Sequence, residues 1–403
     1  MPEVTRLLAD IADVGRDAVR GGWSRPVLST AELDLRAWFV GEAERRGLDV
    51  ETDRNGILWA WWNPAGLPLR DAVVTGSHLD SVPGGGEFDG PLGVASALAA
   101  VDLLQQRGSS LARPLAVAVF PEEEGSRFGV ACLGSRLLTG AIDPDRARGL
   151  RDPEGVTLAE AAAAQGFDPS SFGRDDEALA RIGCFLELHV EQGRGLVDLG
   201  QPVAIGSSIL GHGRWRLTFA GQGNHAGTTL MDDRRDPMVA AARAVVAVRD
   251  AARARPDARA TVGRLRPVPG GTNVIASRVE LWLDARHPDD AVTTALVAEI
   301  EQLARQIAAE EGCTASLVEE SFSVTTVFDE GLRGRIEAVL PNAPLLGTGA
   351  GHDAGVLGTV VPTAMLFVRS PDGISHSPEE SVEDADAEAG AVALADALES
   401  LLT

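Results

Sequence analysis

Short runs of consecutive apolar residues recur along the chain and are typical of strands buried on both faces of a parallel sheet. They lie near residues 71–78, 115–120, 183–189 and 364–368. An amphipathic helix is predicted from Pro91 to Gln106, between the first two runs. Strands that alternate with helices in this way indicate an α/β fold. Open α/β sheets place their active sites at the carboxyl ends of their strands, so the residues after each run are candidates for function.

The same part of the chain carries further helical patterns and one hairpin signal. Asn55–Gly56 is a turn sequence between residues 48–50 and 57–62, so a hairpin is expected there. Helices are expected over residues 3–20, 29–47, 157–165, 330–339 and 383–402.

The pattern changes between residues 211 and 327. The expected order of elements is β-α-β-β-α-β, the split-βαβ arrangement of ferredoxin-like folds. The strands are expected near 212–220, 260–266, 276–286 and 314–326, and the helices near 237–253 and 288–311. We therefore predict an inserted α+β domain at 211–327, and a first domain made of residues 1–210 and 328–403.

Charge and composition narrow the classes of partner. The formal net charge is −23 and the sequence has no basic stripe, so no nucleic acid partner is expected. No apolar run approaches the length of a membrane-spanning helix, and the N-terminal residues lack the pattern of a signal peptide. The three cysteines form no CxxC pair, which favours free thiols in a reducing cytoplasm over disulfides or a zinc knuckle.

Three adjacent carboxylates, Glu122, Glu123 and Glu124, directly follow the apolar run at 115–120. Like charges packed this closely repel, so one must hold a proton or the group must face positive charge. A metal ion would supply that charge. The alternative for such a triplet, taken alone, is a solvated acidic turn.

The chain has only seven histidines, and three of them lie at or just past predicted strand ends, beside Asp or Glu. These are His78, His189 and His376. Histidine is the commonest metal ligand and carboxylate is its usual companion. Each one, taken singly, could be an ordinary hydrogen-bonded histidine. Together with Asp89 and Glu124 they predict a metal site.

Several segments, in collinear order over nearly the whole chain, resemble the M20 metallopeptidase-type amidohydrolases. The resemblance is to the branch that holds allantoate amidohydrolase, N-carbamoyl-L-amino-acid hydrolase and β-ureidopropionase. It rests on six segments: His78–Asp80, Gly86–Gly90, Glu122–Phe128, Leu188–Gly193, Gly221–Gly227 and Gly373–Pro378.

The resemblance implies an α/β catalytic domain with a mixed sheet and a dinuclear metal site. The inserted ferredoxin-like domain would serve as a lid and as the surface of a homodimer. Asp89 would bridge two divalent ions. His78 and His189 would complete one site, and Glu124 and His376 the other. Zinc or manganese is expected, with cobalt or nickel possible, because such ligands accept several metals.

The resemblance also implies catalytic roles. Glu123 would be the general base, and Asp80 would orient His78, although Asp80 could instead be a simple loop cap. Glu122 is better explained as a structural hydrogen-bond acceptor. His225, from the inserted domain and often from the partner subunit, would stabilise the tetrahedral oxyanion.

Substrate contacts follow from the same resemblance. Gln192 would contact the ureido or amide group, and Asn273 and Arg286 would hold the substrate carboxylate, which suits the bidentate fork of arginine. Gly351 and His352 belong to a loop that resembles the family's substrate-lining loop, and for His352 a plain loop hydrogen bond is the alternative.

The expected activity is metal-dependent hydrolysis of a linear C–N bond in a small N-carbamoyl or ureido acid with a free carboxylate. An N-carbamoyl-L-amino acid or allantoate would release ammonia and CO2 or a ureido product. Alternatives on the same site are an N-formyl- or N-acyl-amino-acid hydrolase or a dipeptidase, and a site with a single metal. A protein outside this class would be an inactive binding protein on the same scaffold.

Overall fold

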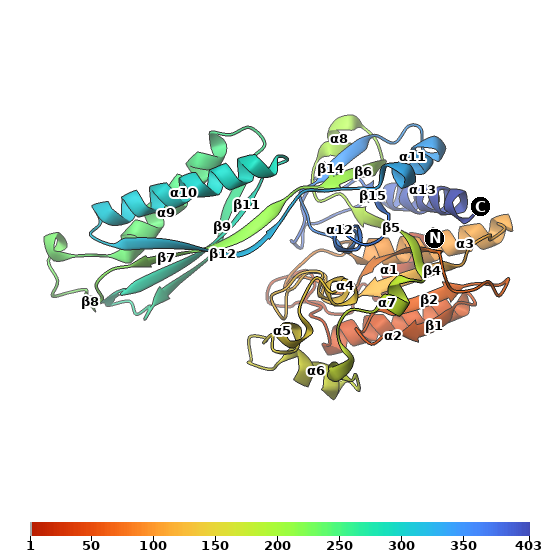
Figure 1. Cartoon of the computed structure of the whole chain (residues 1–403), viewed down its shortest axis with the longest axis horizontal. Coiled ribbons are helices and arrows are strands. Elements are labelled where there is room, and N and C mark those ends of the chain that lie inside the picture. The colour runs from red at the N-terminus through yellow and green to blue at the C-terminus, as the bar shows by residue number, and fades with distance from the viewer. Residues whose placement is uncertain (1) are drawn as a thin grey trace. The chain divides into compact units, whose positions relative to one another are not determined.

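The computed structural model describes residues 2–403, which form two compact units. Unit 1 comprises residues up to Ile209 together with Val327–Thr403, and unit 2 comprises Leu210–Thr326. The colours of Figure 1 show unit 2 as one continuous stretch of green to light blue. Near its two ends, the Gly211 amide donates to the Thr325 hydroxyl at 2.9 Å. The chain therefore enters and leaves unit 2 at neighbouring points.

Unit 1 is built on a nine-stranded mixed sheet. Its order is β1-β2-β4-β3-β5-β15-β6-β13, and β14 pairs with β6. The strands are β1 (Asp49–Thr52), β2 (Leu58–Trp62), β3 (Ala72–His78), β4 (Leu115–Phe120), β5 (Ile182–Val190), β6 (Val203–Ile209), β13 (Thr326–Val327), β14 (Leu345–Thr348) and β15 (Thr363–Val368). The four central strands β4, β3, β5 and β15 run parallel. The predicted hairpin is present as the antiparallel pair β1–β2.

Helices cover both faces of this sheet. They are α1 (Glu3–Ile11), α2 (Thr30–Arg45), α3 (Pro91–Arg107), α4 (Leu133–Thr139), α5 (Pro144–Arg148), α6 (Leu158–Ala164), α7 (Asp176–Leu179), α8 (Gly195–Leu199), α11 (Glu330–Val339), α12 (Asp353–Leu357) and α13 (Asp384–Leu402). Alternate residues of β4 enter opposite cores: Val117 packs with α3 and α13, whereas Ala118 packs with residues of α4 and α12. Burial on both faces explains why the central strands read as unbroken apolar runs.

The predicted helix over residues 3–20 is wrong beyond Ile11, where α1 ends. Turns follow it, and they include Gly15 at φ +76 and Gly21 at φ +77. These are left-handed conformations that a helix cannot continue through and that glycine adopts without strain. Apolar spacing alone therefore overestimated this helix.

Unit 2 is an α+β fold with a four-stranded antiparallel sheet in the order β12-β7-β11-β9. Its elements are β7 (His212–Ala220), β8 (Asn224–His225), α9 (Pro237–Arg253), β9 (Arg259–Val268), β10 (Val274–Ile275), β11 (Arg278–Arg286), α10 (Asp290–Glu310) and β12 (Thr314–Ser323). Both helices pack on one face of the sheet, over a core that includes Leu217, Phe219 and Leu281. The order of strands confirms the predicted split-βαβ arrangement.

The parallel strands of unit 1 end at one edge of the sheet. His78 pairs with Phe120, and Phe367 pairs with His189. The segments that follow β3, β4, β5 and β15 therefore leave the sheet at this edge. Within residues 2–403, no helix has the length and apolar character needed to cross a membrane.

Candidate metal centre and active site

Two histidines from neighbouring strands face each other at this edge. His78 is the last residue of β3 and His189 lies near the end of β5. Their ring centroids are 5.7 Å apart, and both side chains are buried. Gly90 makes the His78 position possible, because a Cβ at Gly90 would lie 2.5 Å from the ring. Gly90 also adopts φ +89 just before helix α3.

Asp89 connects these histidines into a first group. Its Oδ1 lies 3.2 Å from Nε2 of His189 and 3.6 Å from Nε2 of His78. The two Nε2 atoms are 3.5 Å apart. Two imidazole nitrogens and one carboxylate oxygen therefore converge on one point, which is the donor set that divalent transition metals accept.

The second oxygen of Asp89 belongs to a second group. Oδ2 lies 3.4 Å from Nε2 of His376, and that nitrogen lies 3.3 Å from Oε2 of Glu124. The structure thus brings together the five predicted ligands in two groups that share Asp89. Each group holds at least one imidazole and one carboxylate, so the donor chemistry fits a pair of divalent ions.

Main-chain carbonyl groups orient the two buried imidazoles. Nδ1 of His78 donates to the carbonyl of Asp80 at 3.0 Å, and Nδ1 of His189 donates to the carbonyl of Val190 at 3.0 Å. Each ring therefore turns Nε2 toward Asp89, as a metal-binding histidine requires.

The Asp80 carboxylate has a different set of contacts. It lies 3.6 Å from Nδ1 of His78, beyond hydrogen-bond distance, and accepts the amides of Glu123 and Glu124 at 3.1 Å. In this structure its main chain orients His78, and its carboxylate holds the turn that carries Glu123 and Glu124.

The charges of the cluster compensate one another. Burial opposes ionisation of His78, but the carboxylates of Asp80, Asp89 and Glu123 outweigh this and raise its pKa well above the usual value. Burial also disfavours the Asp89 carboxylate, yet His189 and His78 hold its pKa well below its usual range. The hydrogen bond to Glu124 raises the pKa of His376 to about 9. Divalent ions would take the place of these protons.

The three glutamates after β4 have distinct environments. Glu124 belongs to the second group. Oε2 of Glu123 faces the first group, 3.8 Å from Nε2 of His78, and its Oε1 accepts from the Cys132 thiol at 3.3 Å. Burial raises the pKa of Glu123 well above its usual value.

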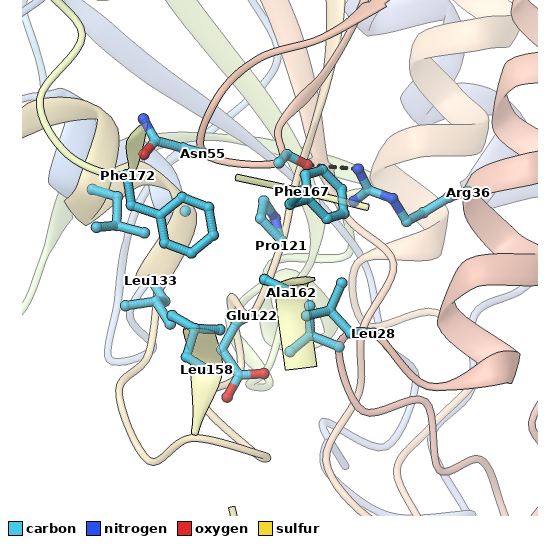
Figure 2. Close-up of a pocket in the computed structure, with 14 residues that line it drawn as sticks. Leu28, Arg36, Asn55, Pro121, Glu122, Leu133, Leu158, Ala162, Phe167 and Phe172 are labelled. Atoms are coloured by element: carbon cyan, nitrogen blue, oxygen red, sulfur yellow. Dashed lines mark hydrogen bonds between the residues drawn. The ribbon is translucent and has the colours of Figure 1, made fainter. Parts of the chain in front are cut away.

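Glu122 points away from the metal ligands. Its Oε1 accepts the amides of Arg127 at 3.0 Å and Phe128 at 2.5 Å, so it closes the loop that follows the triplet. Glu122 also lines an apolar cavity of about 30 Å³ beside Phe167 and Phe172 (Figure 2). This cavity has room for about one or two water molecules and is too small for a substrate.

Gln192 and Ser375 both contact the shared carboxylate. Gln192 Nε2 donates to Oδ2 of Asp89 at 2.9 Å, and the Ser375 hydroxyl lies 3.0 Å from the same oxygen. The side-chain oxygen of Gln192 is buried and has no hydrogen-bond partner in the described chain. The predicted substrate residue Gln192 is therefore at the site, with its amide nitrogen on a ligand and its oxygen available.

His352 is buried against the first group. Its ring centroid lies 4.5 Å from that of His189, and neither ring nitrogen has a hydrogen-bond partner within residues 2–403. Burial, and then the charge of His189, lower its pKa well below the usual value, so the ring is neutral. Gly351 precedes it, in the loop that leads into α12.

The remaining predicted residues lie in unit 2, near opposite ends of strand β11. His225 is exposed on β8 and pairs with Val274, and the carbonyl of Asn273 accepts the amide of Ala226 at 3.0 Å. Arg286 ends β11, pairs with His212 and binds the Asp284 carboxylate at 2.7 Å. The ends of β11 are about 26 Å apart at roughly 3.3 Å per residue. One copy of unit 2 therefore does not bring Arg286 together with His225 and Asn273.

Three residues that contact the predicted ligands or the proposed base were not predicted from the sequence: Ser375, Glu380 and Cys132. A signal was present for the first two, because they lie one residue before and four residues after His376. Cys132 carried no signal, since its contact with Glu123 depends on how the loop after the triplet folds back.

The fold and the site together define a hydrolase of the α/β type, with imidazoles and carboxylates gathered at the carboxyl edge of its sheet. The family model of Peptidase family M20/M25/M40 matches residues 74–400. The chain belongs to this family and, within it, is an amidohydrolase.

Similar proteins of known sequence or structure support this family assignment. The chain is 36% identical to an N-carbamoyl-L-amino acid amidohydrolase of Geobacillus stearothermophilus, over 96% of this chain and 95% of the relative. It is 33% identical to an allantoate amidohydrolase of Bacillus subtilis, over 99% and 97%. A solved amidase of the hydantoinase/carbamoylase family from Burkholderia vietnamiensis superposes with a TM-score of 0.89 at 33% identity, over 99% and 96% of the two chains.

Proposed function

We propose that this protein hydrolyses a linear C–N bond in a small N-carbamoyl or ureido acid that carries a free carboxylate. The substrate is an N-carbamoyl-L-amino acid or allantoate. The observation that carries this proposal is the pair of ligand groups that share Asp89. The names of the relatives supply the substrate class.

The first group (His78, His189, Asp89) and the second (Asp89, Glu124, His376) would each hold one divalent ion, with zinc or manganese favoured and cobalt or nickel possible. When bound, such ions polarise a carbonyl and lower the pKa of water.

Glu123 acts as the general base. It takes a proton from the attacking water and passes it to the leaving nitrogen. Its Oε2 faces the first group, 3.8 Å from Nε2 of His78, and its other oxygen is held by the Cys132 thiol, so Oε2 is the atom placed to exchange a proton with the attacking water. Asp80 holds the turn on which Glu123 lies.

Water adds to the carbamoyl carbon and the C–N bond to the amino acid breaks. The amino acid leaves with the proton from Glu123, and the carbamic acid left behind decomposes to CO2 and ammonia. Allantoate treated in the same way yields a ureido product. Gln192, Gly351 and His352 bind the carbamoyl end, with the free oxygen of Gln192 and the unpaired ring nitrogens of His352 as the available groups.

Arg286 and Asn273 hold the substrate carboxylate and His225 stabilises the oxyanion. Because Arg286 ends β11 and His225 and Asn273 lie near the other end of that strand, we assign Arg286 to one subunit, and His225 and Asn273 to the other, of a homodimer formed through unit 2. Mixing a His225→Ala variant with a Glu123→Gln variant tests this, since mixed dimers contain one site with both groups. Activity that does not return in the mixture, after subunit exchange is demonstrated, contradicts the assignment.

The substrate is tested by assaying ammonia and amino-acid release from allantoate, N-carbamoyl-L-amino acids, β-ureidopropionate and N-formylglutamate. Each assay uses protein loaded with zinc, manganese, cobalt or nickel, and Glu123→Gln protein is the control. Turnover is expected for a carbamoyl or ureido acid. Turnover of the formyl compound alone would refute the proposal.

We place the enzyme in the cytoplasm. Cys132, Cys184 and Cys313 are all free thiols, as a reducing compartment favours.

A further inference from the structure

Glu380 is a buried carboxylate that none of the chemistry above uses. It lies four residues after His376, in the segment that carries this ligand, and its side chain reaches the loop that carries Asp89. Its Oε1 accepts the amides of Phe88 at 2.9 Å and Asp89 at 3.0 Å. Its Oε2 contacts the Ser375 hydroxyl at 3.0 Å. The residue is 6% exposed.

These contacts join two segments that are distant in the sequence. Almost 300 residues separate Glu380 from Asp89, yet the amide of Asp89 is bound directly. The Ser375 hydroxyl also contacts Oδ2 of Asp89 at 3.0 Å. Glu380 therefore binds the main chain of the shared ligand directly, and the Ser375 hydroxyl lies between the two carboxylates and donates to one of them.

The loop before Asp89 is shaped for this contact. A Cβ at Gly86 would lie 2.2 Å from Oε1 of Glu380, so any other residue there would collide with the carboxylate. The approach of the two segments thus depends on a glycine at position 86. A buried carboxylate that accepts two main-chain amides and contacts a hydroxyl is a built feature, because an unpaired carboxylate in such a place would be costly.

We propose that Glu380 is a positioning residue for the second ion. It fixes the Asp89 loop against the His376 segment, so that Oδ2 of Asp89 and Nε2 of His376 meet before an ion binds. The inference rests on the proposed two-ion site, and it concerns ion affinity and not the choice of substrate. Outer contacts of this kind typically change metal affinity by roughly 10–100-fold when removed.

Three variants and one control test this role. Glu380→Ala removes every contact. Glu380→Gln keeps an oxygen for the two amides and an N–H for the Ser375 hydroxyl. Ser375→Ala removes only the path to Oδ2. Glu379→Ala is the matched control, because Glu379 is the neighbouring glutamate and is exposed.

Ion affinity is measured by chelator competition with Zn²⁺ and with Mn²⁺, and the metal-free proteins are compared by thermal unfolding. We expect Glu380→Ala to weaken the second binding event by roughly 10–100-fold and to weaken the first, which also uses Asp89, by less. Glu380→Gln and Glu379→Ala should stay near wild type, and Ser375→Ala should fall between these and Glu380→Ala.

Wild-type affinity for both ions in folded Glu380→Ala protein overturns the inference. If that variant does not fold, Ser375→Ala decides, and unchanged affinity there overturns it as well. If Glu379→Ala weakens binding of the second ion as much as Glu380→Ala does, the inference is also wrong. A wild-type protein that binds two ions but cleaves none of the carbamoyl or ureido acids refutes the proposed function alone, since the affinity measurements do not depend on turnover.

Discussion

Binding of the second ion should release a proton from His376 at neutral pH. The hydrogen bond to Glu124 raises the pKa of this imidazole to about 9, so the metal-free protein carries His376 in its charged form at pH 7. An ion can use Nε2 only after the proton leaves. With a pKa of about 9, the protonated form of His376 is about a hundred times more populated than the neutral form at pH 7. The apparent affinity should therefore fall about tenfold for each pH unit below 9, and level off above it.

The pH dependence of folding stability in the metal-free protein is opposite to that of ion affinity: the raised pKa of His376 favours the fold at low pH and disfavours ion binding there. A raised histidine pKa contributes stability that is complete below the unfolded value of about 6.5 and is lost as the pH rises through the folded value. The His376–Glu124 pair thus stabilises the empty site at neutral pH, where it also competes with the ion. Its contribution should disappear as the pH rises through about 9.

Isothermal titration in buffers of different ionisation enthalpy measures the released protons directly. The second event is identified as the one that disappears in His376→Gln protein. It should release close to one proton from His376 at pH 7 and almost none at pH 10. His287→Ala is the control, because His287 is half-buried in unit 2 and bonds to main-chain groups there. An affinity for the second ion that is independent of pH between 6 and 9 would refute the reasoning.

Three further predictions concern single residues. Glu123→Gln should lower kcat by roughly 10²–10⁴-fold at unchanged metal content, measured by steady-state kinetics and metal analysis. Arg286→Ala should raise KM for carboxylate substrates by roughly 10–100-fold, the value of a lost charged hydrogen bond, and should not affect the corresponding amides. Gly90→Ala should destabilise the fold and weaken binding of the first ion, because its Cβ would meet the His78 ring. Its control is Gly108→Ala, at the other end of α3, where φ is +64 and a Cβ would meet open space. That control should lose only the free energy of backbone strain, about 1–3 kcal/mol, in thermal unfolding.

The elements that could be predicted from the sequence are those whose pattern of apolar residues matches their burial in the folded protein. The apolar runs at 115–120 and 364–368 are buried on both faces, so their sequence could scarcely form anything else. Strand β6 was missed because its residues include two serines and part of it is less buried. The helix expected over 3–20 was overextended because apolar spacing continued into a segment where glycines adopt left-handed turns.

In the site, too, some residues could be predicted from the sequence and others could not. The ligand types could be predicted because the chain has only seven histidines, and three of them lie at or just past predicted strand ends beside carboxylates. The contacts of Glu380 and Cys132 could not, because a hydrogen bond across almost 300 residues, or within a folded-back loop, leaves no local pattern. Asp80 illustrates the limit, since its position was predicted but the division of labour between its carbonyl and its carboxylate required coordinates.

Because the chain enters and leaves unit 2 at neighbouring points, unit 2 can evolve independently of the rest of the protein. All five predicted ligands and Glu123 lie in unit 1, while Leu210–Thr326 is an insertion whose ends meet at the Gly211–Thr325 contact. Mutations in the insertion can therefore accumulate, or the whole segment can be exchanged, without disturbing the ion-binding groups. Selection can therefore alter Leu210–Thr326 and the ion-binding groups of unit 1 separately, as two parts inherited together but changed one at a time.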